Sequence, residues 1–273
     1  VTTTTEYEPE SYDYEDDEPE PTCPPIDPQK TAPRTGQKAW DKCIEYQEEY
    51  VYPCKKEKTM ANVARYSRVN HCKRKANALI VNGVDAAPNE FPHMALLGYQ
   101  PSGEEQIRFS CGGSIVSDRF ILTAGHCIHG GRQGPVAYAL VGILRRSEKY
   151  DQQNLYRIKH IIKHPKYASP GKYNDIALLE TERRISLSGF VVPACLDVGQ
   201  QPALRAIATG WGATSYAGSN ADTLQKVTVS SDSRVVERWT AEPEGPGSIP
   251  HAPLIFKNYV RIIIILLNYH LLR

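Results

Sequence analysis

The apolar positions in the middle of this chain follow the pattern of a β-rich domain. Between residues 80 and 230, short β-prone runs recur, each bounded by Gly, Pro, Ser or Asp, and no long amphipathic helix interrupts them. This series predicts an all-β barrel or sandwich. The expected strands cover residues 94–100, 107–110, 114–117, 120–123, 137–143, 155–162, 176–180, 203–209 and 224–229.

The flanking segments lack this pattern. Residues 1–35 are rich in Thr, Glu, Asp, Tyr and Pro, and we expect them to be disordered because they bury too little apolar surface. Residues 36–79 combine a weak helical period with a basic, polar stretch that suits an exposed linker. Residues 231–273 contain clustered prolines and one apolar run that no turn-forming residues or alternating polar residues accompany, so we expect a tail without a recognisable fold.

The charge pattern narrows the function classes. The net charge of +1 gives no global field that would attract nucleic acid. The charge is nevertheless segregated, because residues 1–20 hold nine acidic side chains and no basic one, whereas residues 55–75 hold eight basic side chains and one acid. We interpret both segments as solvent-exposed. The longest apolar run, residues 262–267, is far shorter than the about 20 residues of a membrane span, so we expect no membrane partner.

The cysteine content indicates an oxidising, extracellular compartment. An odd number leaves at least one thiol without an internal partner, and the chain begins at Val1 without the pattern of a signal peptide. We therefore expect a mature form or a fragment of a secreted protein. The seven cysteines are Cys23, Cys43, Cys54, Cys72, Cys111, Cys127 and Cys195.

Four short motifs in the β-rich region carry recognisable chemistry. In chain order they are Ile80-Val81-Asn82-Gly83, Leu122-Thr123-Ala124-Gly125-His126-Cys127, Asn174-Asp175-Ile176-Ala177-Leu178-Leu179 and Gly210-Trp211-Gly212. In this order and spacing, the chain resembles the chymotrypsin-like serine proteases over about residues 80–230. The resemblance implies an all-β double barrel, and we expect the second barrel to be incomplete because only its first strands are recognisable.

The resemblance implies catalytic roles for His126 and Asp175. His126 would take a proton from a nucleophilic hydroxyl and return it to the leaving amine, while Asp175 would fix the tautomer of the imidazole. A Cys111–Cys127 disulfide would restrain the histidine loop. Gly125 stands where the family usually has alanine, so we expect close packing with slightly more backbone freedom. The alternative is a structural histidine beside a disulfide and an acid that caps a turn or strand.

The resemblance also implies a zymogen, activated by cleavage of the Leu79–Ile80 bond. The apolar residue before this bond, the acidic front end and residues 91–95 are similar to the clip-domain proteases of arthropods. Only three cysteines precede the linker, so we expect residues 36–79 to contain a partial or degenerate clip region. A Cys72–Cys195 disulfide would keep the pro-region attached; alternatively, Cys72 pairs with one of the upstream cysteines, whose own pairing stays open.

The nucleophile of the family lies in a Gly-Asp-Ser-Gly-Gly-Pro segment, which this sequence does not contain. We therefore expect a serine-type endopeptidase zymogen in a truncated, inactive form. The alternative is a non-catalytic homologue that acts as a binding or decoy protein. The implied partners are a protein substrate, an upstream activating protease and a serpin-type inhibitor, with no cofactor. We expect no metal either, because His160 and His164 lack a third ligand.

Overall fold

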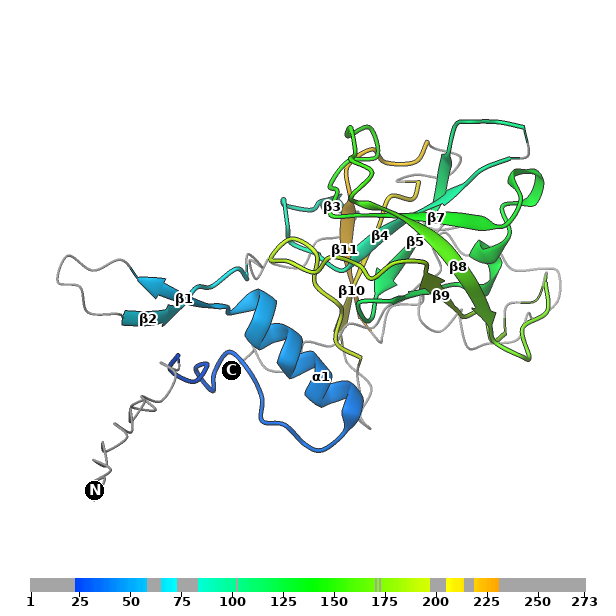
Figure 1. The fold of residues 1–273 in the computed structure, drawn as a ribbon. Helices are drawn as coiled ribbons and strands as arrows, with labels where there is room; N and C mark the ends of the chain where they lie inside the picture. Colours follow the sequence, from blue (N-terminus) through cyan, green and yellow to red (C-terminus); the bar gives the residue numbers. More distant parts are fainter. Residues whose placement is uncertain are drawn as a thin grey trace, which may run out of the picture.

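The computed structural model describes residues 23–57, 65–72, 83–101, 103–169, 171, 173–196, 205–213 and 219–230. A small N-terminal module, formed by the described residues up to 72, lies at one side of a β-rich body (Figure 1). No helix in these ranges is long and apolar enough to cross a membrane. The expected Leu79–Ile80 cleavage bond and the expected tail, residues 231–273, lie outside the described residues.

The N-terminal module is built around one amphipathic helix. α1 (Lys38–Tyr46) agrees with the helical period seen in the sequence, and it continues into a π-helical turn, η1 (Gln47–Val51). The helix buries one face against the rest of the protein. The buried side chains on that face are Cys43, Ile44 and Tyr46.

A β-hairpin completes the module. β1 (Cys54–Glu57) pairs antiparallel with β2 (Arg65–Arg68), so part of the basic stretch expected as a linker is a strand. A disulfide joins Cys23 to Cys54, and the guanidinium of Arg68 donates a hydrogen bond to the carbonyl of Pro24 at 2.7 Å. The expectation that disorder extends to residue 35 is therefore wrong for residues 23–35, because covalent and polar contacts tie this segment to the module.

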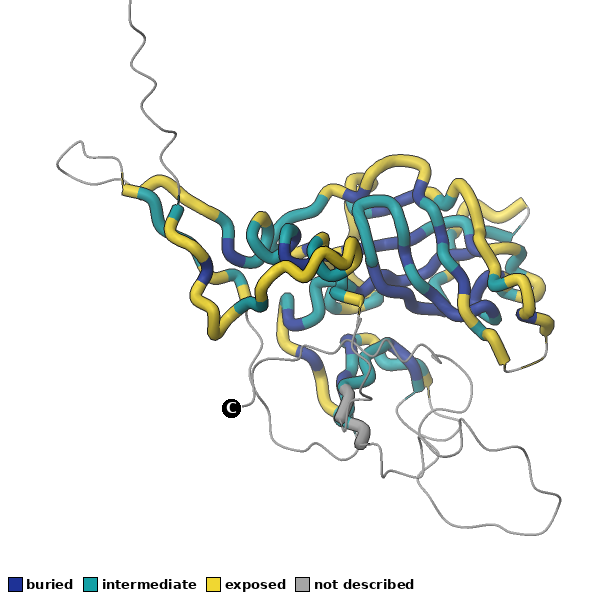
Figure 2. Tube along the Cα trace, turned by 90° about the horizontal axis from the view of Figure 1, so that it is seen from below, coloured by how far each residue is buried: buried dark blue, intermediate teal, exposed yellow. Residues whose placement is uncertain are grey.

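Six antiparallel strands close into a barrel. In pairing order they are β4 (Met94–Tyr99), β5 (Arg108–Ile115), β6 (Phe120–Thr123), β9 (Ala177–Thr181), β8 (Leu155–Lys163) and β7 (Val136–Val141), which pairs again with β4. Small and β-branched or aliphatic side chains fill the interior, as a barrel of this size requires. Buried positions concentrate in these strands, whereas the module is mostly exposed or half-buried (Figure 2). The fully buried interior residues include Ala95, Leu97, Ile115, Ile121, Ala139 and Leu179.

A second, three-stranded sheet packs on the outside of this barrel. Its strands pair in the order β10 (Arg205–Gly210), β11 (Gln225–Ser230) and β3 (Val84–Asp85). Trp211 follows β10 and packs with Met94 and Leu96 of the barrel, while its indole N–H donates to the carbonyl of Leu144 at 2.9 Å. Every residue of β4 is consequently buried, because one face of this strand points into the barrel and the other supports the second sheet.

A buried ion pair joins the chain that follows β3 to β11. The ammonium of Lys226 lies 2.6 and 2.7 Å from the two carboxylate oxygens of Glu90, and both side chains are less than a tenth exposed. Glu90 also accepts the backbone N–H of Ala87 at 2.8 Å. Loss of one partner would leave an uncompensated buried charge, which is strongly destabilising. No local pattern reveals this pair, because 136 positions separate its members.

The all-β prediction is confirmed, with one strand longer than expected. The sequence suggested separate strands at 107–110 and 114–117, but β5 runs unbroken through Gly112 and Gly113. A Cβ atom on Gly113 would lie 2.7 Å from a methyl carbon of Ile121 and 2.9 Å from the carbonyl oxygen of Leu122. Glycine at this position therefore permits close packing of β5 against β6 and does not break the strand.

Candidate active site

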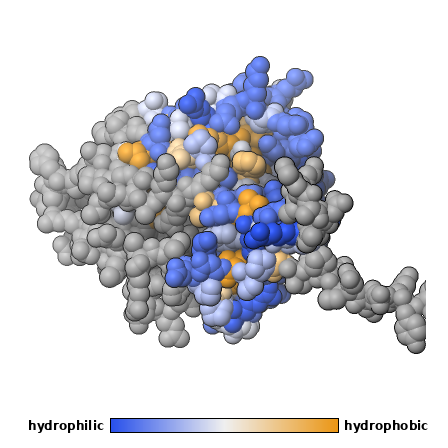
Figure 3. Space-filling view, turned by 90° about the vertical axis from the view of Figure 1, so that its left-hand side faces the viewer, coloured by the Kyte–Doolittle hydropathy of each residue, from blue (hydrophilic) through white to orange (hydrophobic). Residues whose placement is uncertain are grey.

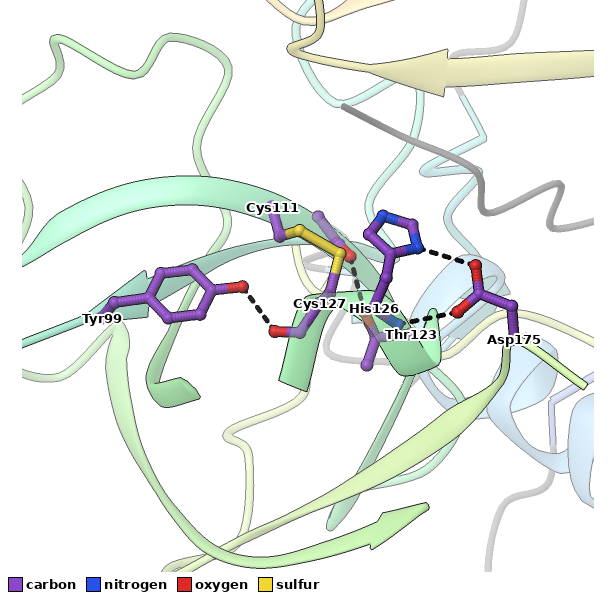
Figure 4. The surroundings of a disulfide bond; sticks show 7 residues. Tyr99, Cys111, Thr123, His126, Cys127 and Asp175 are labelled. Atoms are coloured by element: carbon purple, nitrogen blue, oxygen red, sulfur yellow. Dashed lines mark hydrogen bonds and ion pairs between the residues drawn. A yellow bond between two sulfur atoms is a disulfide. The ribbon is translucent and has the colours of Figure 1, made fainter. Parts of the chain in front are cut away.

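The histidine motif forms a short, well-restrained turn. β6 ends at Thr123, and a 3₁₀ turn, η2 (Gly125–Ile128), follows and is succeeded by a second one, η3 (Gly131–Gln133). The expected disulfide between Cys111 and Cys127 is present and ties η2 to β5. The Thr123 hydroxyl also donates to the carbonyl of Gly112 at 2.9 Å (Figure 4). Two elements on either side of the histidine are thus linked to the same barrel strand.

His126 and Asp175 meet at the end of the β6–β9 pair. The register places Thr123 opposite Ala177, which brings η2 beside the residues that precede β9. One carboxylate oxygen of Asp175 lies 2.7 Å from Nδ1 of His126, and the other accepts the backbone N–H of His126 at 2.7 Å (Figure 4). The aspartate therefore fixes both the ring and the backbone of the histidine.

This geometry sets the direction of proton transfer. An ionised carboxylate only accepts hydrogen bonds, so Nδ1 of His126 carries a proton and Nε2 is left as the basic nitrogen. The side chain of Asp175 is 14% exposed and that of His126 is 34% exposed. The aspartate is thus largely shielded from water, while the imidazole edge stays accessible. The pair can accept a proton from a hydroxyl placed at Nε2 and stabilise the resulting imidazolium.

Two buried tyrosines, which belong to none of the four motifs, pack around the histidine turn. Tyr99 is 1% exposed, and its hydroxyl donates to the carbonyl of Cys127 at 2.5 Å (Figure 4). Burial raises the pKa of Tyr99 well above the ordinary range, so this hydroxyl remains a donor. Tyr167 packs against Gly125, and burial, followed by the nearby charge of Asp175, raises the pKa of Tyr167. Strand alternation along β4 could not have identified Tyr99 as an interior residue, because every position of this strand is buried.

The cysteines beside His126 do not make this turn a metal site. Ligand atoms of Cys111, His126 and Cys127 lie within 4.8 Å of one another. Both sulfur atoms belong to a disulfide, however, and a thiolate is the form of cysteine that binds metal. Of the two histidines considered at the sequence level, His160 instead lies 2.8 Å from a carboxylate oxygen of Glu180.

The expected Cys72–Cys195 disulfide is wrong. Cys195 is bonded to Cys43 of α1, and Cys72 is an exposed free thiol. The amide of Gln47 donates to both sulfur atoms of the Cys43–Cys195 bridge, at 3.4 and 3.7 Å. Cys43 reaches Cys195 because it lies on the buried face of α1, whereas Cys72 follows the hairpin and stays in solvent. Connectivity of this kind does not follow from cysteine spacing.

Sequence similarity relates this chain to known proteins. The Trypsin family profile matches residues 80–242, somewhat beyond the expected limit near residue 230. The chain is 41% identical over 155 residues to Serine protease snk of Drosophila melanogaster. This match covers 55% of this chain and 35% of that protein. It is 37% identical over 149 residues to CLIP domain-containing serine protease C9 of Anopheles gambiae, covering 54% of this chain and 39% of that protein.

One similar solved structure is the crystal structure of the Drosophila Grass clip serine protease of the Toll pathway. It has a TM-score of 0.47 and 30% sequence identity, covering 58% of this chain and 49% of that one. The chain spans 35% and 39% of the length of the two curated relatives above. Because the family profile matches residues 80–242 of 273, more than half of the sequence, the chain belongs to the trypsin family of serine proteases.

Proposed function

We propose that this chain is part of a secreted, chymotrypsin-like serine endopeptidase zymogen and supplies its general base and orienting acid. The two 2.7 Å bonds between Asp175 and His126 carry this proposal. In the mechanism of the family, Nε2 of His126 takes the proton of the nucleophilic serine and later delivers it to the leaving amine. Asp175 keeps the imidazole in the required tautomer and stabilises its protonated form.

We further propose that the polypeptide of these 273 residues does not itself hydrolyse peptide bonds. It contains no Gly-Asp-Ser-Gly-Gly-Pro segment, which would supply both the nucleophile and backbone donors of the oxyanion hole. Loss of a catalytic serine lowers turnover by a factor of about a million. A serine-directed fluorophosphonate probe should therefore leave the chain unlabelled, and labelling that disappears in His126→Ala would refute this part of the proposal.

Completion of the catalytic apparatus tests the proposed base. A chimera would replace residues 231–273 with the corresponding segment of a family member and carry a specific protease site before Ile80. We expect hydrolysis only after cleavage, because the freed Ile80 amine needs the restored aspartate. Asp175→Asn should then lower turnover by about 10⁴, since the wrong histidine tautomer is held. The exposed acid Asp151 provides a matched control, and Asp151→Asn should leave turnover unchanged.

A second candidate function is a non-catalytic homologue that binds or sequesters a partner protein. The absence of the nucleophile segment from the sequence favours it. The same chimera separates the two functions. If it folds, is cleaved before Ile80 and stays inert, the His126 and Asp175 pair is a remnant and the binding function becomes the better proposal.

The proposed zymogen is cleaved at Leu79–Ile80 by an upstream protease with apolar preference, and it acts on a protein substrate under control of a serpin-type inhibitor. The Cys43–Cys195 disulfide then keeps the N-terminal module attached to the protease domain. After cleavage at an engineered site before Ile80, the two parts should separate on a non-reducing gel in Cys43→Ser but remain together in Cys72→Ser. Separation in Cys72→Ser alone would overturn the assigned tether.

A further inference from the structure

The N-terminal module touches the barrel at a turn where a glycine leaves room for it. Gly189 lies in a turn closed by two backbone hydrogen bonds between Ser188 and Val191, of 2.9 and 3.2 Å. The ring of His71, near the end of the module, lies directly on this glycine: a Cβ atom on Gly189 would be 2.4 Å from Nδ1 of His71 and 3.2 Å from two ring carbons. Non-bonded atoms pack about 3.5–4.0 Å apart, so a side chain at position 189 would displace the imidazole.

Each side of this contact is held in place by its own part of the protein. In the module, His71 donates its backbone N–H to the carbonyl of Val51 at 2.8 Å, and its Nδ1 lies 3.2 Å from the carbonyl oxygen of Tyr50. In the barrel, the side-chain amide of Asn89 donates to the carbonyl of Gly189 at 2.8 Å. Surfaces that are fixed before they meet lose little conformational freedom on docking, which favours the contact.

A second non-covalent contact lies on α1. Tyr46 is 8% exposed, and burial, followed by the nearby charge of Asp118, raises the pKa of Tyr46. Asp118 belongs to the turn between β5 and β6 and forms an ion pair with Arg184, so it is a fixed part of the barrel. The module thus meets the barrel on α1, at Tyr46, and again beyond the end of η1, at His71. Two separate contacts prevent rotation of the helix about either one.

The Cys43–Cys195 disulfide lies beside these contacts but does not replace them. It joins one residue of α1 to the chain that follows the turn around Gly189. A bridge at one point leaves the orientation of the two parts open, because the bonds between each Cα and its sulfur can take several staggered rotamers. Hydrophilic side chains cover much of the described surface on the side of the molecule where the module lies (Figure 3). The orientation of the module therefore depends on the non-covalent contacts.

We propose that the non-covalent contacts, with His71 seated on Gly189 as their determinant, hold the module in place on the barrel without the Cys43–Cys195 disulfide. The turn around Gly189 and the turn that carries Asp118 form a docking surface, and its partner is the N-terminal module of the same chain. The disulfide keeps the module at a high effective concentration near this surface, while the contacts set its orientation. Opening the bridge leaves the two parts in the same arrangement. A larger side chain at position 189 releases the module once the bridge is open.

The exposed thiol of Cys72 allows a direct test on the full chain, because it directly follows His71. A nitroxide attached there should broaden the backbone amide resonances of Gly189 and Val191. In the untethered variant, which carries Cys43→Ser with Cys195→Ser, we expect the same broadening as in the unaltered chain. If the broadening disappears when the bridge is removed, the disulfide alone holds the module and the proposal is overturned.

Gly189→Ala in the untethered variant tests the determinant. The new Cβ overlaps the imidazole, so the broadening of Val191 should fall by about fivefold or more. Gly112→Ala is the matched control and should leave the broadening unchanged, because its Cβ would meet only a carbonyl oxygen at 3.7 Å and neither glycine has a positive φ. Broadening that survives Gly189→Ala, or falls equally in the control, overturns the proposal.

His71→Ala disrupts the same contact from the side of the module. In the untethered variant it should reproduce the loss of broadening caused by Gly189→Ala, whereas His160→Ala, which alters an exposed histidine of β8, should not. The amide resonances of the barrel strands report in each variant that the barrel remains folded. If Gly189→Ala lowers the broadening and His71→Ala does not, damage to the turn explains the loss and the proposal fails.

Discussion

Gly125→Ala tests how tightly the residue before His126 is packed. A Cβ atom on Gly125 would lie 2.7, 2.9 and 3.0 Å from three ring carbons of Tyr167. Tyr167 is 5% exposed, so its ring has little room to retreat. The family usually has alanine at this position, and the sequence alone suggested that either small residue would fit. In this chain the missing Cβ lets Tyr167 lie directly against the histidine turn.

Two effects of opposite sign decide how much Gly125→Ala changes the free energy of unfolding. Overpacking a buried site costs about 1–3 kcal/mol, and three close contacts with one buried ring place this case in the upper half of that range. Alanine also restricts the unfolded chain, which stabilises the fold by about 0.4–1 kcal/mol because Gly125 does not need a positive φ. Overpacking wins, and we expect a net loss of about 1–2.5 kcal/mol in the free energy of unfolding.

Urea unfolding of the full chain measures this loss, and thermal unfolding should show a midpoint lowered by roughly 2–10 °C. Gly112→Ala is a matched control, because its Cβ would meet only a carbonyl oxygen at 3.7 Å. In a Tyr167→Leu background the cost of Gly125→Ala should largely disappear, as expected for two residues in contact. If Gly125→Ala is neutral or stabilising, or if its cost is the same with leucine at 167, the packing argument is refuted.

Two further predictions follow from the contacts around the site. Tyr99→Phe should lower the free energy of unfolding by about 1–2 kcal/mol, because it leaves the buried carbonyl of Cys127 without its donor. The variant should also shift the downfield resonance of the proton on Nδ1 of His126. An unchanged resonance would show that the hydroxyl only stabilises the core. Ser147→Ala should raise the pKa of Asp222 toward that of an ordinary aspartate, because bonds from the hydroxyl and backbone N–H of Ser147 lower it. A group whose pKa is lower in the folded than in the unfolded protein contributes stability that is lost as the pH falls through the acidic range. Ser147→Ala should therefore lose less stability on acidification than the unaltered chain. A carbon-13 titration of Asp222 and acid unfolding of both proteins measure the two effects.

The contact between His126 and Asp175, the proposed catalytic pair, could be predicted because each residue lies in a local motif. His126 follows a buried strand and precedes a cysteine, and Asp175 opens another apolar strand. Both motifs sit at the ends of strands whose type the alternation of apolar residues already indicates. Once the family is recognised, contact between His126 and Asp175 is implied, and the structure adds the pairing of β6 with β9 and the two 2.7 Å bonds.

The partners of the cysteines could not be predicted in the same way. Cys111 and Cys127 are near in sequence, and their expected bridge is present. Cys195 was expected to pair with Cys72, and its bond to Cys43 instead depends on which face α1 buries. That choice is made by the packing of the module against the barrel, which spacing does not encode.

By itself, the sequence determined the β-rich class, most strands of the barrel and the family, and it identified the residues proposed to carry the chemistry, because alternation and local motifs are properties of neighbouring residues. Only the tertiary structure decided that β4 is buried on both faces, that Lys226 and Glu90 form a buried pair, and that Tyr167 lies against Gly125. Each of these depends on side chains that are far apart in sequence and meet through strand register and layer packing. Contacts of that kind have no local signal, so they become visible only when the chain is folded.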